Sequence, residues 1–236
     1  MGFWNYRSIE QFSENDVKDW AECGMTVTQS PYFDPEKHDK KLITDLLDAC
    51  LRCDIKLILR DSRSAGKKFS NKEAYRKGMT EAFADFGKHP AVYGFFIGDE
   101  PSTAEEHQNC IAAYQIQKEI APNLIPMLNF LPWGPWWMEG GKNLEKQMKD
   151  FISESGADFI CYDHYGQMNP EESGTESYFA NLRFYSDLAA DADIPFWTTL
   201  LSIGHYRYRC PTQDDFRWQL STSVASGCKG VLWFYF

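Results

Sequence analysis

Two adjacent carboxylates at the end of a strongly apolar run are the most informative chemical feature of this sequence. Asp99 and Glu100 follow the apolar segment 92–98, and Pro101 ends that segment at once. Two charges at the tip of a core strand indicate that something at the tip uses them. Neighbouring carboxyl groups raise each other's pKa, so one of them can hold a proton near neutral pH. The pair therefore predicts acid–base chemistry; the alternative is a surface loop in which Asp-Glu has no such role.

Polar and aromatic side chains also follow most of the other segments that resemble strands. In α/β folds with parallel strands, the carboxyl ends of the strands meet at one edge, which carries the active site. Asp163 lies at such an end and adds a third carboxylate. We expect the following residues to gather beside it and to bind a substrate: Gln29, Tyr32, Arg60, Asn129, Trp133, Trp136, Trp137, Tyr162, His164, Tyr165, His205, Tyr206 and Trp233.

This combination of aromatic rings and carboxylates fits a carbohydrate. Sugars present flat C–H faces that stack on aromatic rings, and hydroxyl groups that need polar partners. The tryptophans of segment 133–137 would form a stacking platform, unless their loop folds over the rim and buries them. Hydrolysis of a glycosidic bond needs a carboxylic acid that protonates the leaving oxygen and a second group that acts at the anomeric carbon. Glu100 suits the first role, and Asp99 or Asp163 suits the second.

Asp163, His164 and His205 could instead hold a metal ion. However, no His-x-His pair follows the first strand and no lysine ends a middle strand, although metal-dependent hydrolase barrels usually depend on such groups. Cys50 and Cys53 form a single Cys-x-x-Cys pair, with no second pair to complete a zinc site. No Gly-x-Ser-x-Gly motif is present, which disfavours a serine hydrolase. We expect neither a metal nor a cofactor, and a metal-dependent hydrolase is kept as an alternative.

Strands and helices alternate along the whole chain. Seven helical patterns separate eight short apolar segments, and strict alternation implies a parallel sheet with right-handed crossovers. Eight units favour a closed (β/α)8 TIM barrel over an open sheet. We therefore expect residues 1–236 to form one catalytic domain of the α/β class. The predicted strands are 2–7, 26–32, 56–60, 92–98, 125–130, 159–163, 196–201 and 230–236.

The chain stops on the eighth predicted strand, 230–236. A closed barrel usually covers that strand with an eighth helix, and without it Trp233 and its neighbours would be bare on the outer face. We therefore expect the domain to be truncated at its C-terminus. It would then bury this seam against a missing C-terminal segment or a second copy of the chain.

Composition disfavours several kinds of partner. The net charge of −10 does not provide the basic face that nucleic acid needs. No apolar run approaches the roughly 18 residues of a membrane helix, so no membrane partner is expected. The seven cysteines are scattered and odd in number, which favours reduced thiols over a disulfide framework. No signal peptide is visible, which leaves the localisation open between the cytoplasm and secretion after removal of a signal.

Segment 93–101 resembles the fourth-strand signature of (β/α)8-barrel glycoside hydrolases. In that family an Asn-Glu-Pro or Asp-Glu-Pro tripeptide places the acid/base glutamate, and here the tripeptide contains Glu100. The resemblance runs through nearly the whole chain and implies a glycosidase acting on an oligo- or polysaccharide, with Glu100 as general acid. Later segments resemble bacterial barrel glycosidases distantly related to β-galactosidases, namely 129–132, 162–165, 195–197 and 230–234.

One departure from the family pattern affects the mechanism. Retaining members place a nucleophilic glutamate at the end of the seventh strand, whereas segment 197–205 contains no acid. The Asp99-Glu100 pair resembles that of hexosaminidases, in which the substrate's acetamido group attacks while the aspartate orients it. Alternatively, Glu100 acts across the cleft from Asp163, because strands two places apart suit the separation of about 6.5–9.5 Å in an inverting enzyme. A carbohydrate-binding pseudoenzyme on the same barrel is a further alternative.

Overall fold

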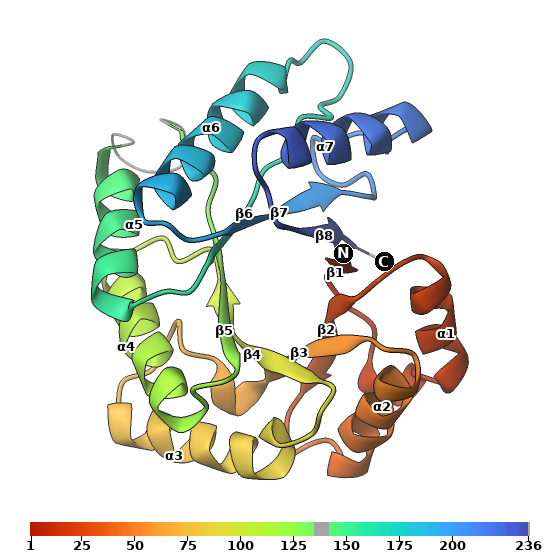
Figure 1. Cartoon of the computed structure of the whole chain (residues 1–236), viewed down its shortest axis with the longest axis vertical. Helices are drawn as coiled ribbons and strands as arrows, with labels where there is room; N and C mark the ends of the chain where they lie inside the picture. Colours follow the sequence, from red (N-terminus) through yellow and green to blue (C-terminus); the bar gives the residue numbers. More distant parts are fainter. Residues whose placement is uncertain (135–141, 236) are drawn as a thin grey trace.

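The computed structural model describes residues 1–134 and 142–235. Eight parallel strands form one sheet in the order β1-β8-β7-β6-β5-β4-β3-β2, and helices surround the sheet (Figure 1). The strands are β1 (Gly2–Phe3), β2 (Val27–Phe33), β3 (Lys56–Asp61), β4 (Val92–Asp99), β5 (Ile125–Phe130), β6 (Ile160–Asp163), β7 (Phe196–Leu201) and β8 (Gly230–Phe234). The α-helices are α1 (Glu14–Glu22), α2 (Lys40–Arg52), α3 (Lys72–Ala82), α4 (Ala104–Ile120), α5 (Lys142–Ser155), α6 (Thr175–Asp191) and α7 (Gln213–Ala225). The predicted (β/α)8 barrel is confirmed, and no helix follows β8 in the part of the chain that the structure describes.

Apolar side chains fill both faces of the sheet. Outside the barrel, one cluster packs the sheet against α4, α5 and α6, and a second packs it against α1, α2 and α3. The barrel interior holds a third cluster, so a ligand pocket has to form above it at the strand ends. Its members are Trp4, Ile58, Met127, Phe159, Cys161 and Leu232.

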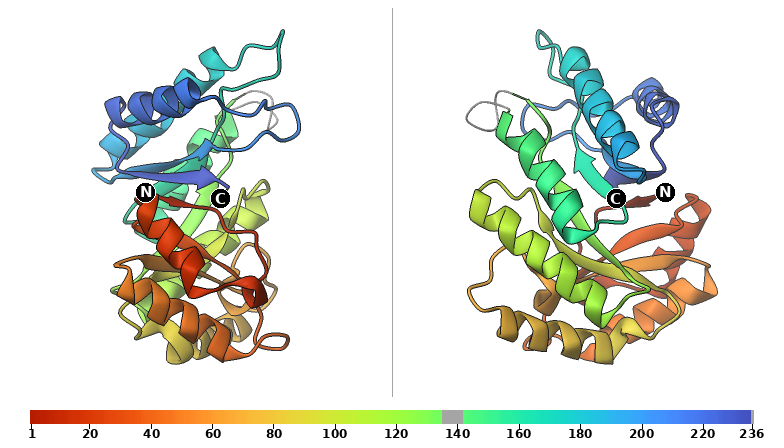
Figure 2. Two further views of the ribbon diagram at one scale, coloured as in Figure 1. Left: turned by 90° about the vertical axis from the view of Figure 1, so that its right-hand side faces the viewer. Right: turned by 60° about the vertical axis from the view of Figure 1, so that its left-hand side comes forward.

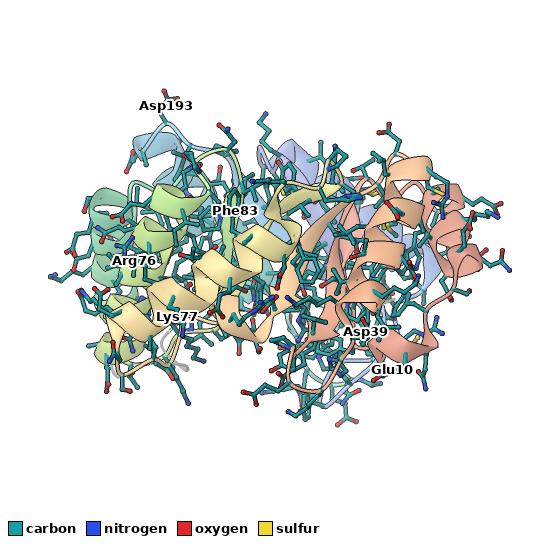
Figure 3. The ribbon with its side chains drawn as sticks, turned by 90° about the horizontal axis from the view of Figure 1, so that it is seen from below. Glu10, Asp39, Arg76, Lys77, Phe83 and Asp193 are labelled. Carbon is teal, nitrogen blue, oxygen red and sulfur yellow. The ribbon has the colours of Figure 1, made fainter. Side chains whose placement is uncertain are left out.

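The outer faces of the helices carry charged side chains, as Figure 3 shows for Arg76 and Lys77 on α3. Arg76 forms an ion pair with Glu119 of α4 at 2.6 Å, which links two neighbouring helices. Figure 2 shows that the two ends of the chain lie close together, where β1 adjoins β8. None of the helices within the described ranges is long and apolar enough to cross a membrane.

β1 is much shorter than the predicted strand 2–7. The Trp4 N–H still donates to the Trp233 carbonyl at 2.9 Å, but the chain beyond it leaves the sheet. The Asn5 side-chain oxygen accepts a hydrogen bond from the Arg7 N–H at 3.2 Å, a local turn that competes with strand pairing. The prediction of strand for residues 5–7 is therefore wrong, and these residues are free to contribute to the rim of the barrel.

Closure of the barrel between β1 and β2 depends on few contacts. The Met1 carbonyl accepts from the N–H groups of Thr26 and Val27, at 2.7 and 3.2 Å. The buried Thr28 hydroxyl donates to the Phe3 carbonyl at 3.0 Å and lies 3.3 Å from the Phe3 N–H, which donates to it. A side chain thus bridges the two backbones at a place where no regular ladder between β1 and β2 forms.

The substitution Thr28→Val tests this bridge, because it keeps the shape of the side chain and removes the hydroxyl. Breaking buried hydrogen bonds while their backbone partners stay buried costs about 1–3 kcal/mol. We expect the free energy of unfolding, measured by urea denaturation, to fall within that range. Thr80→Val, at an exposed position of α3, is the control. An equal loss in both variants would show that the seam does not depend on the hydroxyl.

Candidate active site

Three carboxyl groups meet around one amide at the carboxyl ends of β4, β5 and β6. Asn129 of β5 donates from Nδ2 to Asp99 Oδ1 at 3.0 Å and to Asp163 Oδ1 at 2.7 Å. A further hydrogen bond joins the carboxyl groups of Asp163 and Glu100. Cys161 Sγ lies 3.5 Å from Asn129 Oδ1 and donates to it, which fixes the amide with its nitrogen toward the acids. The three acids that the sequence singled out therefore form one cluster.

Asp99 and Glu100 share this cluster because the backbone turns between them. In a regular strand, successive side chains point to opposite faces. β4 ends at Asp99, and Glu100 has a φ of 47°, in the left-handed region that residues other than glycine seldom adopt. The Glu100 N–H donates to the Asn129 carbonyl at 2.8 Å, and Lys67 Nζ donates to the carbonyls of both Asp99 and Glu100 at 2.8 Å. These bonds hold a conformation that costs on the order of 1–3 kcal/mol.

The three acids differ in how readily they ionise. Burial, followed by the charges of Glu100 and Asp99, raises the pKa of Asp163 well above its usual range. Burial and then the Asp99 charge raise the pKa of Glu100. Burial also raises the pKa of Asp99, but a hydrogen bond from the Asn129 amide and the positive charges of Lys67 and Arg60 oppose it. Lys67 and a hydrogen bond from Asp163 likewise oppose the raised pKa of Glu100. Asp163 is therefore the acid that holds its proton most firmly, and the Glu100–Asp163 pair retains a proton as one coupled unit.

The acid cluster forms the floor of a pocket of about 350 Å³ with a largely aromatic wall. Asp99 lines this pocket. Its side chain is exposed to the pocket, but protein atoms surround its carboxyl group on the other sides. Five predicted residues other than the acids line the pocket, which are Asn129, His164, Tyr165, His205 and Tyr206. Five lining residues were not predicted, which are Trp4, Tyr6, Pro132, Tyr208 and Phe234. We name this space the acid pocket.

Trp4 and Tyr6 escaped prediction because the first strand ends much earlier than its sequence suggests. They follow β1 directly, and the rule that residues after a strand line the site would have found them with the correct boundary. Trp4 Nε1 donates to Thr199 Oγ1 at 3.0 Å, and its ring stacks on Tyr6 with centroids 6.3 Å apart. Tyr208 was not predicted for a different reason. It pairs with His205 in an irregular hairpin, which has no regular pattern of apolar residues in the sequence.

Three of the predicted aromatic residues point away from the acid pocket and pack against helices. Alternation along β6 and β8 turns Tyr162 and Trp233 outward, while the loop after β5 turns Trp133 outward. Trp233 is half-buried by this contact, so part of the surface expected to be bare beside β8 is covered. The partners and centroid distances are Tyr185 at 3.8 Å for Tyr162, Phe184 at 5.5 Å for Trp133 and Phe216 at 5.2 Å for Trp233.

The remaining predicted residues have other positions. Gln29 is fully buried inside the barrel, with Nε2 lying 3.8 Å from the sulfur of Met127, and does not line the acid pocket. Tyr32 and Arg60 line a separate, neighbouring pocket. The predictions for Trp136 and Trp137 lie outside the described residues. Trp133 therefore does not form the stacking platform that was expected from the loop after β5. The aromatic wall of the acid pocket comes from other loops.

His164 is neutral in this setting, because burial lowers its pKa to about 4. Its Nε2 lies 3.0 Å from Ser177 Oγ, and that hydroxyl donates its hydrogen to the Gly174 carbonyl at 3.0 Å. His164 therefore donates from Nε2 and keeps a lone pair on Nδ1. Within residues 1–134 and 142–235, no group of three His, Cys, Asp or Glu side chains is arranged to hold a metal ion.

The carboxyl separation differs from the one expected for an inverting pair. Strand spacing alone predicts Glu100 and Asp163 about 6.5–9.5 Å apart, with room for a water molecule between them. Their hydrogen bond instead brings the two carboxyl groups into contact. The left-handed turn at Glu100 takes this residue off the regular path of β4, which the strand spacing alone does not include.

Comparison with known proteins agrees with this fold. No protein-family model and no curated protein matches the sequence. A provisionally assigned α-L-fucosidase from Bacteroides thetaiotaomicron matches with a TM-score of 0.75 at 14% identity, over 99% of this chain and 86% of its own. A β-galactosidase from the psychrophilic Marinomonas ef1 matches with a TM-score of 0.73 at 11% identity, over 99% of this chain and 53% of its own. The endoglucanase catalytic domain from Thermobifida fusca has a TM-score of 0.66 at 11% identity, with coverages of 100% and 78%.

These likenesses show the fold that the chain shares with glycoside hydrolases. The chain spans little more than half the length of the β-galactosidase, and 59% of a similar glucosidase from Croceicoccus marinus. The structural neighbours are thus (β/α)8 barrels of one broad enzymatic class, although their named sugars differ. What this chain itself acts on has to be argued from its own side chains.

The variant Asp163→Asn tests the state of the acid cluster through stability. An acid whose pKa is raised by folding binds its proton more tightly in the folded chain, so stability falls as pH rises from the unfolded pKa, about 3.9, toward the folded one. Asparagine has the shape of the protonated acid and does not titrate. We expect the variant to gain stability relative to wild type as the pH is raised from about 4 to about 7.

Urea denaturation at several pH values is the measurement, and Asp187→Asn on the exposed surface of α6 is the control. A stability difference between Asp163→Asn and wild type that stays constant with pH would contradict the raised pKa.

Proposed function

We propose that this protein is a glycoside hydrolase in which Glu100 is the general acid. The observation that carries the proposal is the cluster of Asp99, Glu100 and Asp163 at the floor of the acid pocket. Protonation of a leaving oxygen near neutral pH needs a carboxyl group with a raised pKa in a pocket that a substrate can enter. Glu100 has both properties, and the structural neighbours give the proposal independent support.

The wall of the acid pocket suits a sugar ring. Tyr6, Tyr165, Tyr206 and Tyr208 present aromatic surface, and their hydroxyl groups can bind sugar hydroxyls. Burial keeps the phenols of Tyr6 and Tyr165 protonated and able to donate, since it raises the pKa of Tyr6 to about 12 and that of Tyr165 well above its usual range. The pocket volume of about 350 Å³ is at the lower end of the range for small-molecule sites, roughly 300–1,000 Å³.

For the second catalytic group, we propose the acetamido oxygen of the substrate itself, oriented by Asp99. A hydrogen bond already joins the carboxyl groups of Glu100 and Asp163, and segment 197–205 supplies no acid from β7. The Asn129 amide and the charges of Lys67 and Arg60 favour the ionised form of Asp99, and a carboxylate is the group that an acetamido N–H can donate to. Asp163 would then hold the proton that Glu100 delivers.

The variant Glu100→Gln removes the proton donor and keeps its shape. General acid catalysis contributes about 10²–10⁴-fold, so we expect kcat on a natural glycan to fall by that factor. The loss should be smaller for activated aryl glycosides, whose leaving groups need less protonation. Glu105→Gln, at an exposed position in the first turn of α4, is the control. Equal kcat of Glu100→Gln and wild type on the glycan would exclude Glu100 as the acid.

A panel of nitrophenyl glycosides tests the second group. We expect release of nitrophenol from N-acetylhexosaminides and inhibition by thiazoline analogues of the acetamido intermediate. Cleavage of plain galactosides or glucosides at a similar kcat/KM would sink the acetamido mechanism and point to Asp163 as the second catalytic group. Binding of sugars without release from any glycoside would favour a carbohydrate-binding pseudoenzyme, which the missing acid on β7 keeps as a second candidate.

A further inference from the structure

Arg60, at the carboxyl end of β3, differs from the other arginines in forming no ion pair with any of the described residues, although the charge of Asp99 acts on it from the neighbouring pocket. Within residues 1–134 and 142–235, every other arginine has a carboxylate oxygen at 2.5 to 3.2 Å. Arg60 has no such ion pair, although it is more buried than most of them. Burying a guanidinium without a carboxylate in contact is unfavourable, and burial lowers the pKa of Arg60, although the charges of Tyr6 and Asp99 oppose this shift in part. The position has a physical cost that a bound anion would offset.

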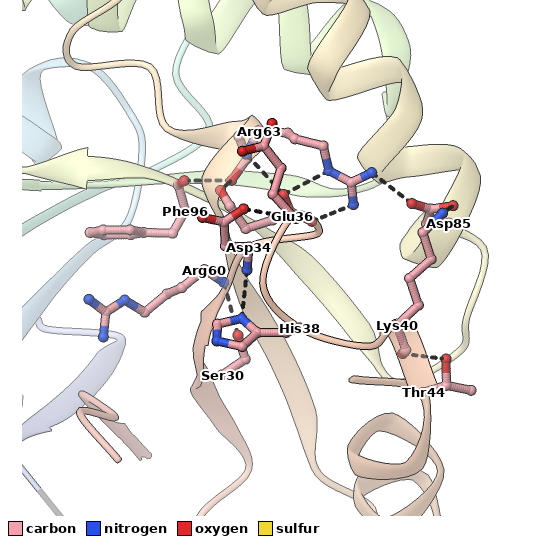
Figure 4. A network of polar contacts seen from close by, with 12 residues as sticks. Ser30, Asp34, Glu36, His38, Lys40, Thr44, Arg60, Arg63, Asp85 and Phe96 are labelled. Carbon is pink, nitrogen blue, oxygen red and sulfur yellow. Dashed lines mark hydrogen bonds and ion pairs between the residues drawn. The ribbon is translucent and has the colours of Figure 1, made fainter. Parts of the chain in front are cut away.

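The side chain of Arg60 is nevertheless held in place. Nη1 donates to the Asn5 carbonyl at 2.6 Å, and the guanidinium lies over the rings of Tyr6 and Phe96, 5.2 and 5.9 Å from their centroids. Figure 4 shows Arg63 turned toward Asp85, while the guanidinium of Arg60 points in the opposite direction. None of the Arg60 nitrogens is both buried and without a partner, so the remaining N–H groups are open to solvent. They are preorganised donors for which residues 1–134 and 142–235 provide no acceptor.

These donors lie in the wall of a second pocket of about 400 Å³. Lys67 and Lys68 also line this pocket, and both form ion pairs with Glu106, at 3.8 and 3.4 Å, so Arg60 is the cation of the wall with no such pair among the described residues. The carboxylate of Asp61 lies in the same wall but is 1% exposed and is bound by Arg63 at 2.7 Å. Tyr32 and Phe96 add aromatic surface to the pocket. The chemistry on offer is thus an anion-binding fork beside rings on which a sugar face can stack.

The second pocket adjoins the acid pocket. Tyr6 lines the acid pocket and its ring contacts Arg60. Gly98 lines the second pocket, whereas its neighbour Asp99 lines the acid pocket. A chain of two or more sugar residues could therefore enter both spaces, with its scissile bond near Glu100 and a neighbouring residue beside Arg60.

We propose that the second pocket is a subsite for an anionic sugar residue, whose carboxylate or sulfate group binds the guanidinium of Arg60. The planar fork of arginine can donate two parallel hydrogen bonds to either group, which is stronger and more specific than a neutral contact. This inference rests on the proposed glycosidase function and narrows its substrate to acidic glycans. A carboxylate and a sulfate group bind arginine through the same hydrogen bonds. Two pairs of ligands, each an anionic sugar and its neutral counterpart, distinguish between them.

Calorimetry on the full chain would compare digalacturonate with its dimethyl ester, and 6'-sulfolactose with lactose. We expect wild type to bind at least one anionic member about tenfold more tightly than its neutral partner, a difference of about 1.4 kcal/mol. In Arg60→Gln the ratio should fall to about one, and in Arg60→Lys it should be intermediate, because lysine keeps the charge without the fork. The series that shows the effect identifies carboxylate or sulfate.

Arg183→Gln, an exposed arginine of α6, is the matched control and should keep the wild-type ratio. Thermal melts of all variants would verify folding, since Arg60→Gln also removes the hydrogen bond to Asn5. No preference for either anion in wild type, or an unchanged preference in folded Arg60→Gln, would overturn the subsite. Because binding is measured without turnover, an inactive protein that still shows this preference would contradict the glycosidase function alone.

Discussion

The two hydrogen bonds that the Asn129 amide donates to Asp99 and Asp163 are the constraint on which the rest of the site depends. Like charges at such short range repel, and an amide that donates to both acids lowers that cost without adding a formal charge. Asn129 is itself buried on β5 and held by Cys161, so its direction is set by the barrel and not by the loops. The acids are therefore placed by the most rigid part of the molecule, while loops supply the walls around them.

The backbone at Glu100 complements this arrangement. A strained turn persists only where its surroundings determine it, and here the determinants are a bond to β5 and a lysine that binds two successive carbonyls. The positive charge of the same lysine, Lys67, also lowers the pKa of Asp99 and Glu100 and so opposes the rise that burial causes. One side chain from outside the strand thus affects both the geometry and the protonation of the acid pair.

The sequence was sufficient to predict the barrel and the three acids, because both rest on local patterns: alternating elements, and charges directly after apolar strands. It failed where a side chain's direction decides its role. Tyr162 and Asp163 are neighbours in sequence, yet strand alternation sends one to a helix and the other to the pocket. Strict use of that alternation would have separated them. The burial of Trp133 against α6 and the early end of β1 at Phe3 depend instead on tertiary contacts that periodicity does not contain.

Closure of the barrel also has a consequence for folding. Trp4, in the pocket wall, is held by a hydrogen bond to Thr199 across 195 positions of sequence, and its backbone pairs with Trp233. Contacts of such long range carry a large loop-closure entropy and form late. During synthesis, β4, β5 and β6 can bring the acids together well before β8 emerges, whereas the wall that encloses them is incomplete until both halves of the barrel meet. The chemistry and the enclosure of this site therefore belong to different stages of folding.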